Sequence, residues 1–310
     1  MPILRQDLKL LSDKQTLEQC LTKPPPPPAG KEKQSPWPHW YSSTSQKVKN
    51  IGTQGGISCY KAAVQNPGDF SLLQTAVIRT DVPTSGNPSK LCHQTIEVGW
   101  INFPTQVAEP HLFTFYNTNG YTEIADYKGG WNTEVKGWVQ YDHTIFPGAV
   151  GGPLCVDGGL QTEMPIRIQL YQGNWWVYVA DRWIGYYPAS LFSTGEADPS
   201  QTLAQGSNQV NWYGEVYQTD IALTTTDMGS GEWPWTRWSH SAFMKNITYL
   251  DADGVPHGYY GTQHSFVSDE ARYNMEPHYD SGTAWGSYMW IGGPGAGGKI
   301  GAVEQEGKGS

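Results

Sequence analysis

The sequence predicts an all-β fold, a sandwich or a barrel, on three observations. Aromatic residues make up 13% of the 310-residue chain. Turn formers are also abundant, with 36 Gly and 22 Pro. From about residue 46 onward, short stretches of aromatic and β-branched residues alternate with Gly, Pro and Asn turns, and helical periodicity is nearly absent. Many short strands separated by turn signals are typical of β-sandwiches and barrels.

The chain divides into three parts. Residues 1–45 combine a helical pattern over residues 1–23 with the proline-rich stretch PPPPPAGKEKQSPWP, which we interpret as a linker or a pro-segment. Residues 46–297 are expected to form one large β domain, and residues 298–310 a flexible tail. Within the domain we expect strands at residues 56–62, 72–80, 94–103, 111–117, 134–141, 164–171, 174–180, 183–187, 209–218, 239–249, 256–267 and 284–292.

One pair of these strands carries a hairpin signal. The stretch LYQGNWWVYV predicts a turn at residues 172–174 between two strands. Strand alternation then places Trp175, Val177 and Val179 on one face of the second strand, and Trp176 and Tyr178 on the other.

Charge and hydropathy argue against two classes of partner. The formal net charge is −9 and no Lys/Arg cluster or basic stripe is present, so we do not expect binding to nucleic acid. No stretch approaches the roughly 20 apolar residues of a membrane span, and MPILRQDLKLL has too little apolar length for a signal peptide. We expect a monomer that binds neither nucleic acid nor membrane.

Several common catalytic and metal-binding patterns are missing. The chain has no GxSxG nucleophile elbow, no HExxH and no CxxC pair. The stretch DADG at residues 251–254 lacks the later glutamate of a calcium loop and predicts a tight turn. We expect no metal site, although the eight scattered histidines leave a site assembled by folding open.

The cysteines and one asparagine suggest covalent modification. Cys20, Cys59, Cys92 and Cys155 allow three complete pairings, and the sequence cannot choose among them. We expect a Cys59–Cys92 disulfide because both residues lie inside the folded region. Asn246 begins an Asn-Ile-Thr glycosylation acceptor sequence, which fits an exported protein.

Two glutamates stand in strands that are rich in aromatic residues. In QVNWYGEVYQ, alternation places Glu215 on the same face as Tyr213 and Tyr217, and in HQTIEVGWINFP, Glu97 stands among apolar and aromatic neighbours. Burying a carboxylate is costly, so its place in such a strand needs a reason. If the two glutamates meet on one sheet face, their titrations split, and one becomes a general base and the other a proton donor. Acid proteases and glycosidases divide their two carboxyl groups in this way.

Six ordered stretches carry a further resemblance: TIEVGWINFP…HLFTFYNTNGY (95–121), GNWWVYVADRWIGYYPASLF (173–192), VNWYGEV (210–216), TTTDMGSGEWP (224–234), SAFMKNITY (241–249) and YMWIGGPG (288–295). In this order they resemble the neprosin family of glutamic peptidases, and the match spans roughly residues 52–297. Plant members of that family carry a short cysteine-bracketed loop where this chain has TEIADYKGGW.

The resemblance implies a jelly-roll-like sandwich of two antiparallel sheets with a cleft across one of them. It also implies a secreted endopeptidase that cleaves after proline in peptides or proteins, without metal or cofactor. By motif position its catalytic pair is Glu97 and Glu215. Tyr213 and Tyr217 are then candidates for packing a proline ring of the substrate.

The resemblance leads to expectations about pH dependence and self-cleavage, and it leaves two alternative functions to consider. Activity should peak in acid because the pair must share one proton. The proline-rich stretch is a candidate self-cleavage site, and which glutamate acts as base stays open. A glycoside hydrolase or lyase, or a non-catalytic carbohydrate- or protein-binding module, would also fit an aromatic-lined β-sandwich.

Overall fold

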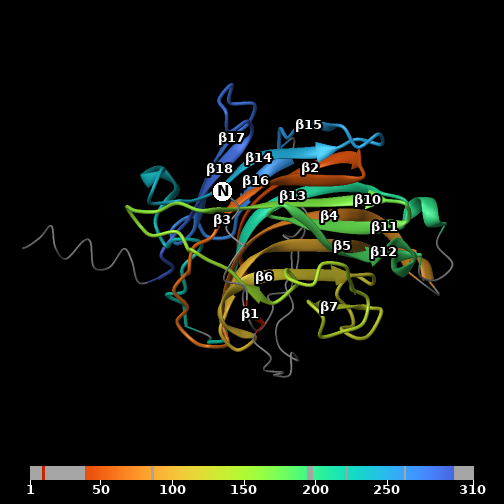
Figure 1. The fold of residues 1–310 in the computed structure, drawn as a ribbon, viewed down its shortest axis with the longest axis horizontal. Coiled ribbons are helices and arrows are strands. Elements are labelled where there is room, and N and C mark those ends of the chain that lie inside the picture. Colours follow the sequence, from red (N-terminus) through yellow and green to blue (C-terminus); the bar gives the residue numbers. More distant parts are fainter. Residues whose placement is uncertain are drawn as a thin grey trace, which may run out of the picture.

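The structure is a computed structural model, and it describes residues 9–10, 39–84, 87–193, 198–220, 222–261 and 263–296. Within these residues, two antiparallel sheets of nine strands each pack against one another, which confirms the predicted sandwich. Figure 1 shows strands β13, β4, β5 and β6 of the first sheet one below another.

The first sheet, sheet A, carries both candidate glutamates. A short strand, β7 (Gly129–Trp131), pairs with β6 outside the main order. In spatial order the strands are β1 (Lys9–Leu10), β9 (Ala149–Val150), β6 (Val107–Asn117), β5 (Asn87–Phe103), β4 (Phe70–Thr84), β13 (Ser207–Tyr217), β2 (His39–Asn50) and β16 (Gln263–Val267).

The second sheet, sheet B, covers one face of sheet A. A short strand, β15 (Pro256–Gly258), pairs with β14, and three short 3-10 helices lie in the connections at Ala189–Phe192, Pro199–Gln201 and Pro234–Thr236. In spatial order the strands are β17 (Asn274–His278), β18 (Tyr288–Gly292), β14 (Ala242–Leu250), β3 (Gly52–Ser58), β10 (Glu163–Tyr171), β11 (Asn174–Val179), β12 (Arg182–Pro188) and β8 (Val139–Gln140).

The main core lies between the two sheets and follows the alternation of the strands. Trp212 and Val216 of β13 join Trp175, Val177 and Val179 of β11 in one buried cluster. This confirms the predicted faces of both strands. Burial of apolar surface of this kind contributes about 25 cal/mol per Å² to folding.

The predicted hairpin between β10 and β11 is confirmed. Tyr171 pairs with Asn174, which leaves Gln172 and Gly173 as a two-residue turn. Both turn residues have positive φ, 48° and 73°, which matches the right-handed twist of the flanking strands. The DADG stretch is likewise a turn, because the Asp251 carboxylate accepts hydrogen bonds from the backbone N–H groups of Asp253 and Val255.

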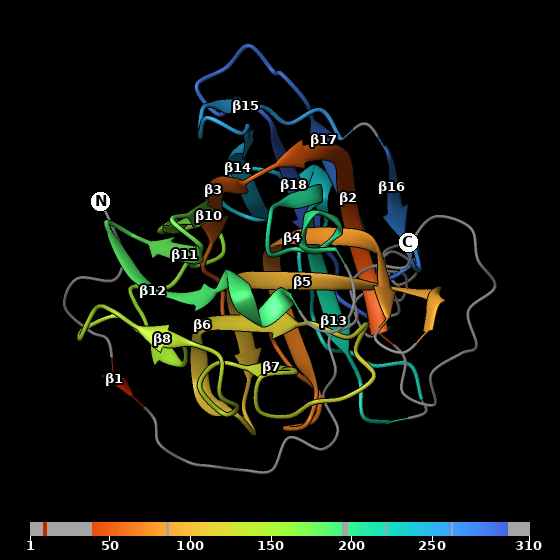
Figure 2. The same ribbon diagram turned by 90° about the vertical axis from the view of Figure 1, so that its right-hand side faces the viewer.

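The N-terminal part of the prediction needs correction. Strand β2 begins at His39 and pairs along its length with β13, so the boundary expected at residue 45 falls inside a strand. Residues 9–10, expected in a helix, form β1 instead and pair with β9. Figure 2 shows β1 and β2 on opposite sides of the molecule. The remaining residues before His39 and the tail after residue 296 lie outside the described residues.

Three expected strands also differ in extent. The strand expected at residues 134–141 is limited to β8, and the one expected at 56–62 lies earlier in the chain, as β3. The stretch 256–267 is divided into β15 and β16, which join different sheets. Gly261, with φ of 52°, lies between the two strands, and alternation alone does not reveal this change of sheet.

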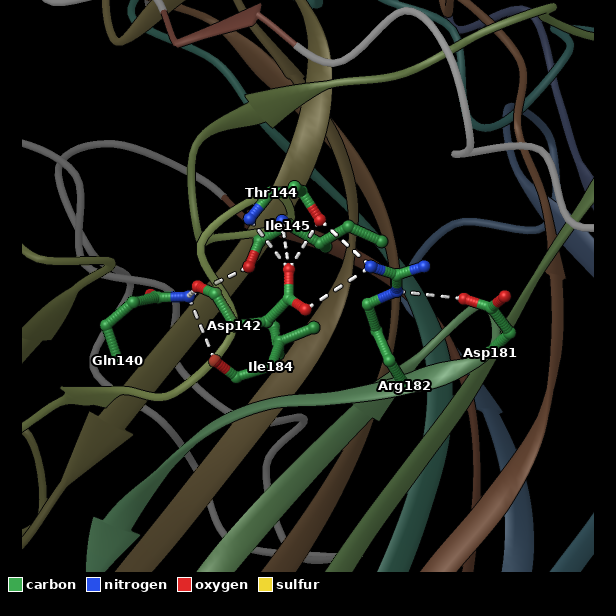
Figure 3. Close-up of polar contacts among 7 residues, drawn as sticks. All are labelled: Gln140, Asp142, Thr144, Ile145, Asp181, Arg182 and Ile184. Carbon is green, nitrogen blue, oxygen red and sulfur yellow. Dashed lines mark hydrogen bonds and ion pairs between the residues drawn. The ribbon is translucent and has the colours of Figure 1, made fainter.

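A polar network fixes the connection that follows β8 (Figure 3). The Asp142 carboxylate accepts hydrogen bonds from the Thr144 hydroxyl at 2.6 Å and from the backbone N–H of Ile145 at 2.8 Å. Its other oxygen lies 3.3 Å from the Arg182 guanidinium. Although desolvation acts in the opposite direction, these hydrogen bonds and the Arg182 charge lower the pKa of Asp142 to about 2.

Within the described part of the chain, helices of membrane-spanning length and hydropathy are absent.

Candidate active site

Glu97 and Glu215 lie on the same face of sheet A, on the side away from sheet B. Both are fully buried. Glu97 on β5 pairs with Ala76 of β4, and Glu215 on β13 pairs with Leu72 of the same strand. The two glutamates are thus two strands apart and four residues apart in register, so their Cα atoms are separated by about 10 Å across the strands and about 13 Å along them. The structure therefore places the two predicted residues on one face of sheet A.

Each of the two glutamate motifs contains a glycine at a closely packed position. A Cβ atom on Gly99, two residues after Glu97, would lie 2.1 Å from the backbone oxygen of Leu73. A Cβ on Gly214, next to Glu215, would lie 2.7 Å from the sulfur of Met228. Both candidate motifs therefore contain a glycine because a side chain at either position would displace a neighbour.

Hydroxyl groups surround the Glu97 carboxyl group. Its Oε1 accepts hydrogen bonds from Tyr121 at 2.5 Å and Thr95 at 3.1 Å, and its Oε2 accepts one from Tyr213 at 3.3 Å. Burial raises the pKa of Glu97 to about 7, and these hydrogen bonds oppose the rise. Glu97 therefore holds a proton through most of the acid range.

Tyr121 was not predicted as a site residue, and its backbone explains how it reaches Glu97. It lies in the turn after β6 with φ of 60°, a conformation uncommon outside glycine. The Asn117 side chain accepts hydrogen bonds from the backbone N–H groups of Asn119 and Tyr121, which hold the turn. The ring stacks on Phe115 at 5.8 Å between centroids. The Asn-Gly pair before Tyr121 is a turn signal that could have identified this conformation.

Glu215 has a different environment. Nδ1 of His39 lies 2.6 Å from its Oε1, and the Tyr41 hydroxyl also hydrogen-bonds the carboxyl group. Its Oε2 is buried without a hydrogen-bond partner. Burial, followed by the charge of Glu97, raises the pKa of Glu215 well above its ordinary value, whereas Tyr41 lowers it.

Several aromatic rings pack against one another on this face. Tyr217 stacks on Phe70 at 5.3 Å, and Phe70 and Phe115 both contact Trp131 edge to face. Tyr213 is fully buried and donates its hydroxyl to Glu97. The proposed contact of Tyr213 and Tyr217 with a substrate proline therefore stays a prediction.

Gln74 on β4 lies between the two glutamates and was missed from the sequence. It pairs with Tyr213 on one side and with Gly99 on the other. Its side chain is fully buried, and neither amide atom has a hydrogen bond of good geometry, although it lies close enough to lower the pKa of Glu97. An unpaired buried amide costs about 1–3 kcal/mol, so a buried amide that lacks a partner suggests a place for a ligand group. The sequence feature that could have identified Gln74 is a single glutamine within the apolar stretch FSLLQTAVI.

The expected Cys59–Cys92 disulfide is not present, because both residues are free thiols. Cys59 follows β3 of sheet B, and its backbone oxygen accepts a hydrogen bond from the backbone N–H of Cys155. Cys92 belongs to β5 of sheet A, where it pairs with Val82. Cys92 therefore lies in sheet A, whereas Cys59 directly follows a strand of sheet B. Cys20 lies outside the described residues.

Two other predicted features can be placed. Asn246 is exposed, at an irregular position of β14 with φ of 54°, and its glycosylation stays a prediction. Within the described ranges, no cluster of three or more His, Cys, Asp or Glu side chains is placed to hold a metal ion.

Comparison with solved structures finds similarity at low identity to three peptidase structures. The chain is similar to scytalido-glutamic peptidase with a peptide-based transition state analogue, at 6% identity and a TM-score of 0.39, over 82% of this chain and 98% of that chain. A structure of scytalido-glutamic peptidase with a transition state analogue inhibitor gives the same identity and shares, with a TM-score of 0.41. SCP-B, a member of the Eqolisin family of peptidases in complex with the tripeptide Ala-Ile-His, gives a TM-score of 0.37 at 6% identity, over 82% and 98% of the two chains.

A protein-family comparison is decisive. The family model described as Neprosin matches residues 67–294, which include both glutamates, Gln74 and Tyr121. This match covers more than half of the chain, and the chain belongs to the neprosin family.

Proposed function

We propose that the protein is an endopeptidase of the glutamic type that hydrolyses peptide bonds with Glu97 and Glu215, preferentially after proline. Membership of the neprosin family supports a glutamic-type peptidase. The observation that carries the choice of residues is their shared position, since both glutamates are buried on one aromatic face of sheet A on either side of β4.

The reaction needs one carboxylate and one carboxylic acid. The ionised glutamate accepts a proton from a bound water, and the resulting hydroxide attacks the carbonyl carbon of the scissile bond. The protonated glutamate hydrogen-bonds the carbonyl oxygen while the tetrahedral intermediate carries negative charge. Proton transfer to the amide nitrogen then allows the C–N bond to break, and the pair again holds one proton between its two members.

Gln74 fits a supporting role in this reaction. Its side chain lies between the two glutamates, and neither amide atom makes a hydrogen bond of good geometry. A fixed amide donor beside the developing oxyanion would stabilise the transition state more than the ground state.

The titration of Glu97 supports activity in acid. Its pKa of about 7 means that Glu97 keeps its proton below neutrality and loses it as the pH rises through neutrality. Activity should therefore decline above about pH 7, and at low pH it should decline again when both carboxyl groups are protonated.

Preference for proline and self-processing are proposed on the family resemblance. Tyr213 and Tyr217 present aromatic rings on the face that carries Glu215, and a proline ring packs well on such rings. The stretch PPPPP at residues 24–28 would then be a cleavage site within the chain itself. It lies outside the described residues, so intact mass after incubation at acid pH is the direct test. Secretion is proposed on the same resemblance, and the exposed Asn246 acceptor fits it.

Digestion of a peptide library across pH 2–8, read by mass spectrometry, tests the proposed function. We expect cleavage that is strongest in acid and enriched after proline. Release of reducing sugar from polysaccharides without peptide cleavage would favour a glycoside hydrolase or lyase instead. Absence of both activities across this range would favour a binding module.

A further inference from the structure

His39 makes the closest polar contact to either glutamate from a basic residue. Its Nδ1 lies 2.6 Å from Glu215 Oε1, although the two residues are 176 positions apart in the chain. The contact is dry, because the side chains are only 8% and 0% exposed. It is built by the sheet, since β2 pairs with β13 and places His39 opposite Tyr217.

Aromatic rings fix the orientation of the imidazole. The His39 ring lies 4.8 Å from Tyr217, 6.2 Å from Tyr41 and 6.1 Å from Phe70, measured between ring centroids. The Tyr41 ring is nearly parallel to it, at 9°, and the Phe70 ring meets it edge-on at 65°. With the ring confined on several sides, its Nδ1 stays directed at Glu215.

The two glutamates differ in the type of donor that they contact. Glu97 contacts only groups that carry no positive charge, namely the hydroxyls of Tyr121, Thr95 and Tyr213 and the nearby Gln74 amide. Glu215 contacts an imidazole, which can carry a positive charge. Because His39 takes one oxygen of Glu215, the buried and unpartnered Oε2 is the oxygen available to a water or substrate.

A shared proton allows an ionised carboxylate to persist in this dry site. A buried carboxylate alone is driven to the neutral form, and burial is the largest cause of the raised pKa of Glu215. The second cause is the charge of Glu97, which is absent while Glu97 holds its proton. An imidazolium at 2.6 Å opposes this effect, since the pair of Glu215 carboxylate and His39 imidazolium has no net charge. Among the described residues, the hydrogen-bond partners given for Glu97 are uncharged, and His93 on the same strand contacts the Tyr121 ring.

We propose that His39 is a positioning residue that keeps Glu215 ionised at acid pH, and that Glu215 is therefore the general base and Glu97 the proton donor. This inference rests on the proposed peptidase function and extends it. The other titratable groups that face the pair are Tyr41 on β2, Tyr213 and Tyr217 on β13, and Glu97 on β5.

The pH profile of kcat/KM for a cleaved peptide tests the proposal. Without the imidazolium, Glu215 needs a higher pH to ionise, so His39→Phe should move the acid limb upward by about 1 to 2 pH units. At pH 4, kcat should fall at least about 10-fold. His39→Asn keeps an N–H near the Nδ1 position without the charge, and it should show the same shift with KM nearly unchanged. His278→Phe, which removes a histidine 3.0 Å from Glu276 on sheet B, is the matched control and should leave the profile in place.

An unshifted acid limb in both His39 variants would overturn the proposal. A merely structural role for His39 would lower kcat/KM at every pH by the same factor and would leave the pH of the acid limb unchanged.

A second readout does not depend on activity. Nitrogen NMR of labelled histidine in the full chain should show His39 as an imidazolium between pH 4 and 6, and as a weaker base in Glu215→Gln. A neutral His39 at pH 4 would overturn the proposal. An imidazolium in a protein that cleaves no peptide would refute the peptidase function and leave the ion pair standing.

Discussion

At the scale of single residues, the hydrogen-bond partners of the glutamates decide how each one titrates. Both carboxyl groups are buried to the same extent, so burial alone would raise their two pKa values by similar amounts. Hydroxyl donors stabilise the charged form of Glu97 and limit the rise of its pKa to about 7. Changes to these donors should therefore move the alkaline limb of the activity profile.

Tyr121→Phe tests this role. The variant removes the 2.5 Å hydrogen bond to Glu97 and keeps the stacked ring on Phe115. Because that hydrogen bond lowers the pKa of Glu97, its loss should raise this pKa and move the alkaline limb upward by up to about 1 pH unit. Kinetics between pH 5 and 9 provide the measurement. A limb that stays in place would show that Glu97 is not the group that titrates there.

Gln74→Ala tests the proposed amide donor. We expect kcat to fall about 100-fold with KM changed much less, because the interaction strengthens only as the oxyanion forms. The folded state should lose little stability, since the amide has no hydrogen bond of good geometry to lose. Gln65→Ala, whose amide oxygen accepts a hydrogen bond from the backbone N–H of Thr225, is a control away from the site. Wild-type kcat in Gln74→Ala would remove Gln74 from the mechanism.

The sequence identified Glu97 and Glu215 as candidates, and alternation in QVNWYGEVYQ correctly predicted the face of the strand on which Glu215 lies, because alternation is a local property. His39, Gln74 and Tyr121 depend on contacts between distant segments. The His39 contact spans 176 positions, and its strand was not expected. The expected disulfide was wrong for a related reason, since the assignment of a cysteine to a sheet follows from topology.

At the scale of elements, β2 is a strand that the alternation of apolar and polar residues does not predict. The stretch WYSSTSQKVKN carries a run of small and polar residues after a proline-rich segment, which is typical of a linker. In the structure it is nevertheless an inner strand of sheet A, and Ser42, Ser43 and Thr44 are buried between β13 and β16. Backbone pairing on both sides satisfies the hydrogen bonds that make such burial possible.

Close packing of β4 and β5 gives an element-scale prediction. Gly99→Ala should destabilise the protein by about 1–3 kcal/mol, because the added Cβ would meet the Leu73 backbone oxygen at 2.1 Å and force the strands apart. Urea denaturation at pH 5 measures this loss. Gly173→Ala is a useful contrast, since its Cβ would meet no atom within 4 Å and only its φ of 73° would be strained. Equal stability of Gly99→Ala and wild type would contradict this packing.

The network around Asp142 gives a second prediction at this scale. Its folded-state pKa of about 2 lies below the ordinary value, so its contribution to stability is present above about pH 4 and is lost as the pH falls toward 2. Asp142→Asn should therefore cost about 1–2 kcal/mol at pH 6 and little at pH 2. Denaturation at both values measures the difference. A cost that does not change with pH would mean that the Asp142 charge is not what holds this connection.

At the scale of the whole molecule, buried carboxyl groups favour acid conditions. Burial raises the pKa of Glu97 to about 7 and that of Asp227 to about 6. Groups with a raised pKa hold more protons in the folded state than in the unfolded state between about pH 4 and 7, so their contribution to stability is fully present below this window and is lost across it. Glu97 alone should account for about 3 kcal/mol. Burial lowers the pKa of His111 to about 4, and its contribution changes in the opposite direction over this window. Glu97→Gln isolates the Glu97 contribution, and its Tm relative to the wild type should rise from pH 4 to pH 7. A Tm difference between Glu97→Gln and the wild type that stays constant over this window would contradict the raised pKa of Glu97.

The most direct test of the two-glutamate mechanism compares peptide cleavage by Glu97→Gln, Glu215→Gln and the wild type at the pH of maximal activity. Each variant should remain folded and lose at least about 100-fold in kcat, because neither can hold or transfer the shared proton. Glu109→Gln, which changes an exposed glutamate paired with Lys61, should cleave at the wild-type rate. A folded Glu97→Gln or Glu215→Gln variant that digests peptide as fast as the wild type would contradict the mechanism.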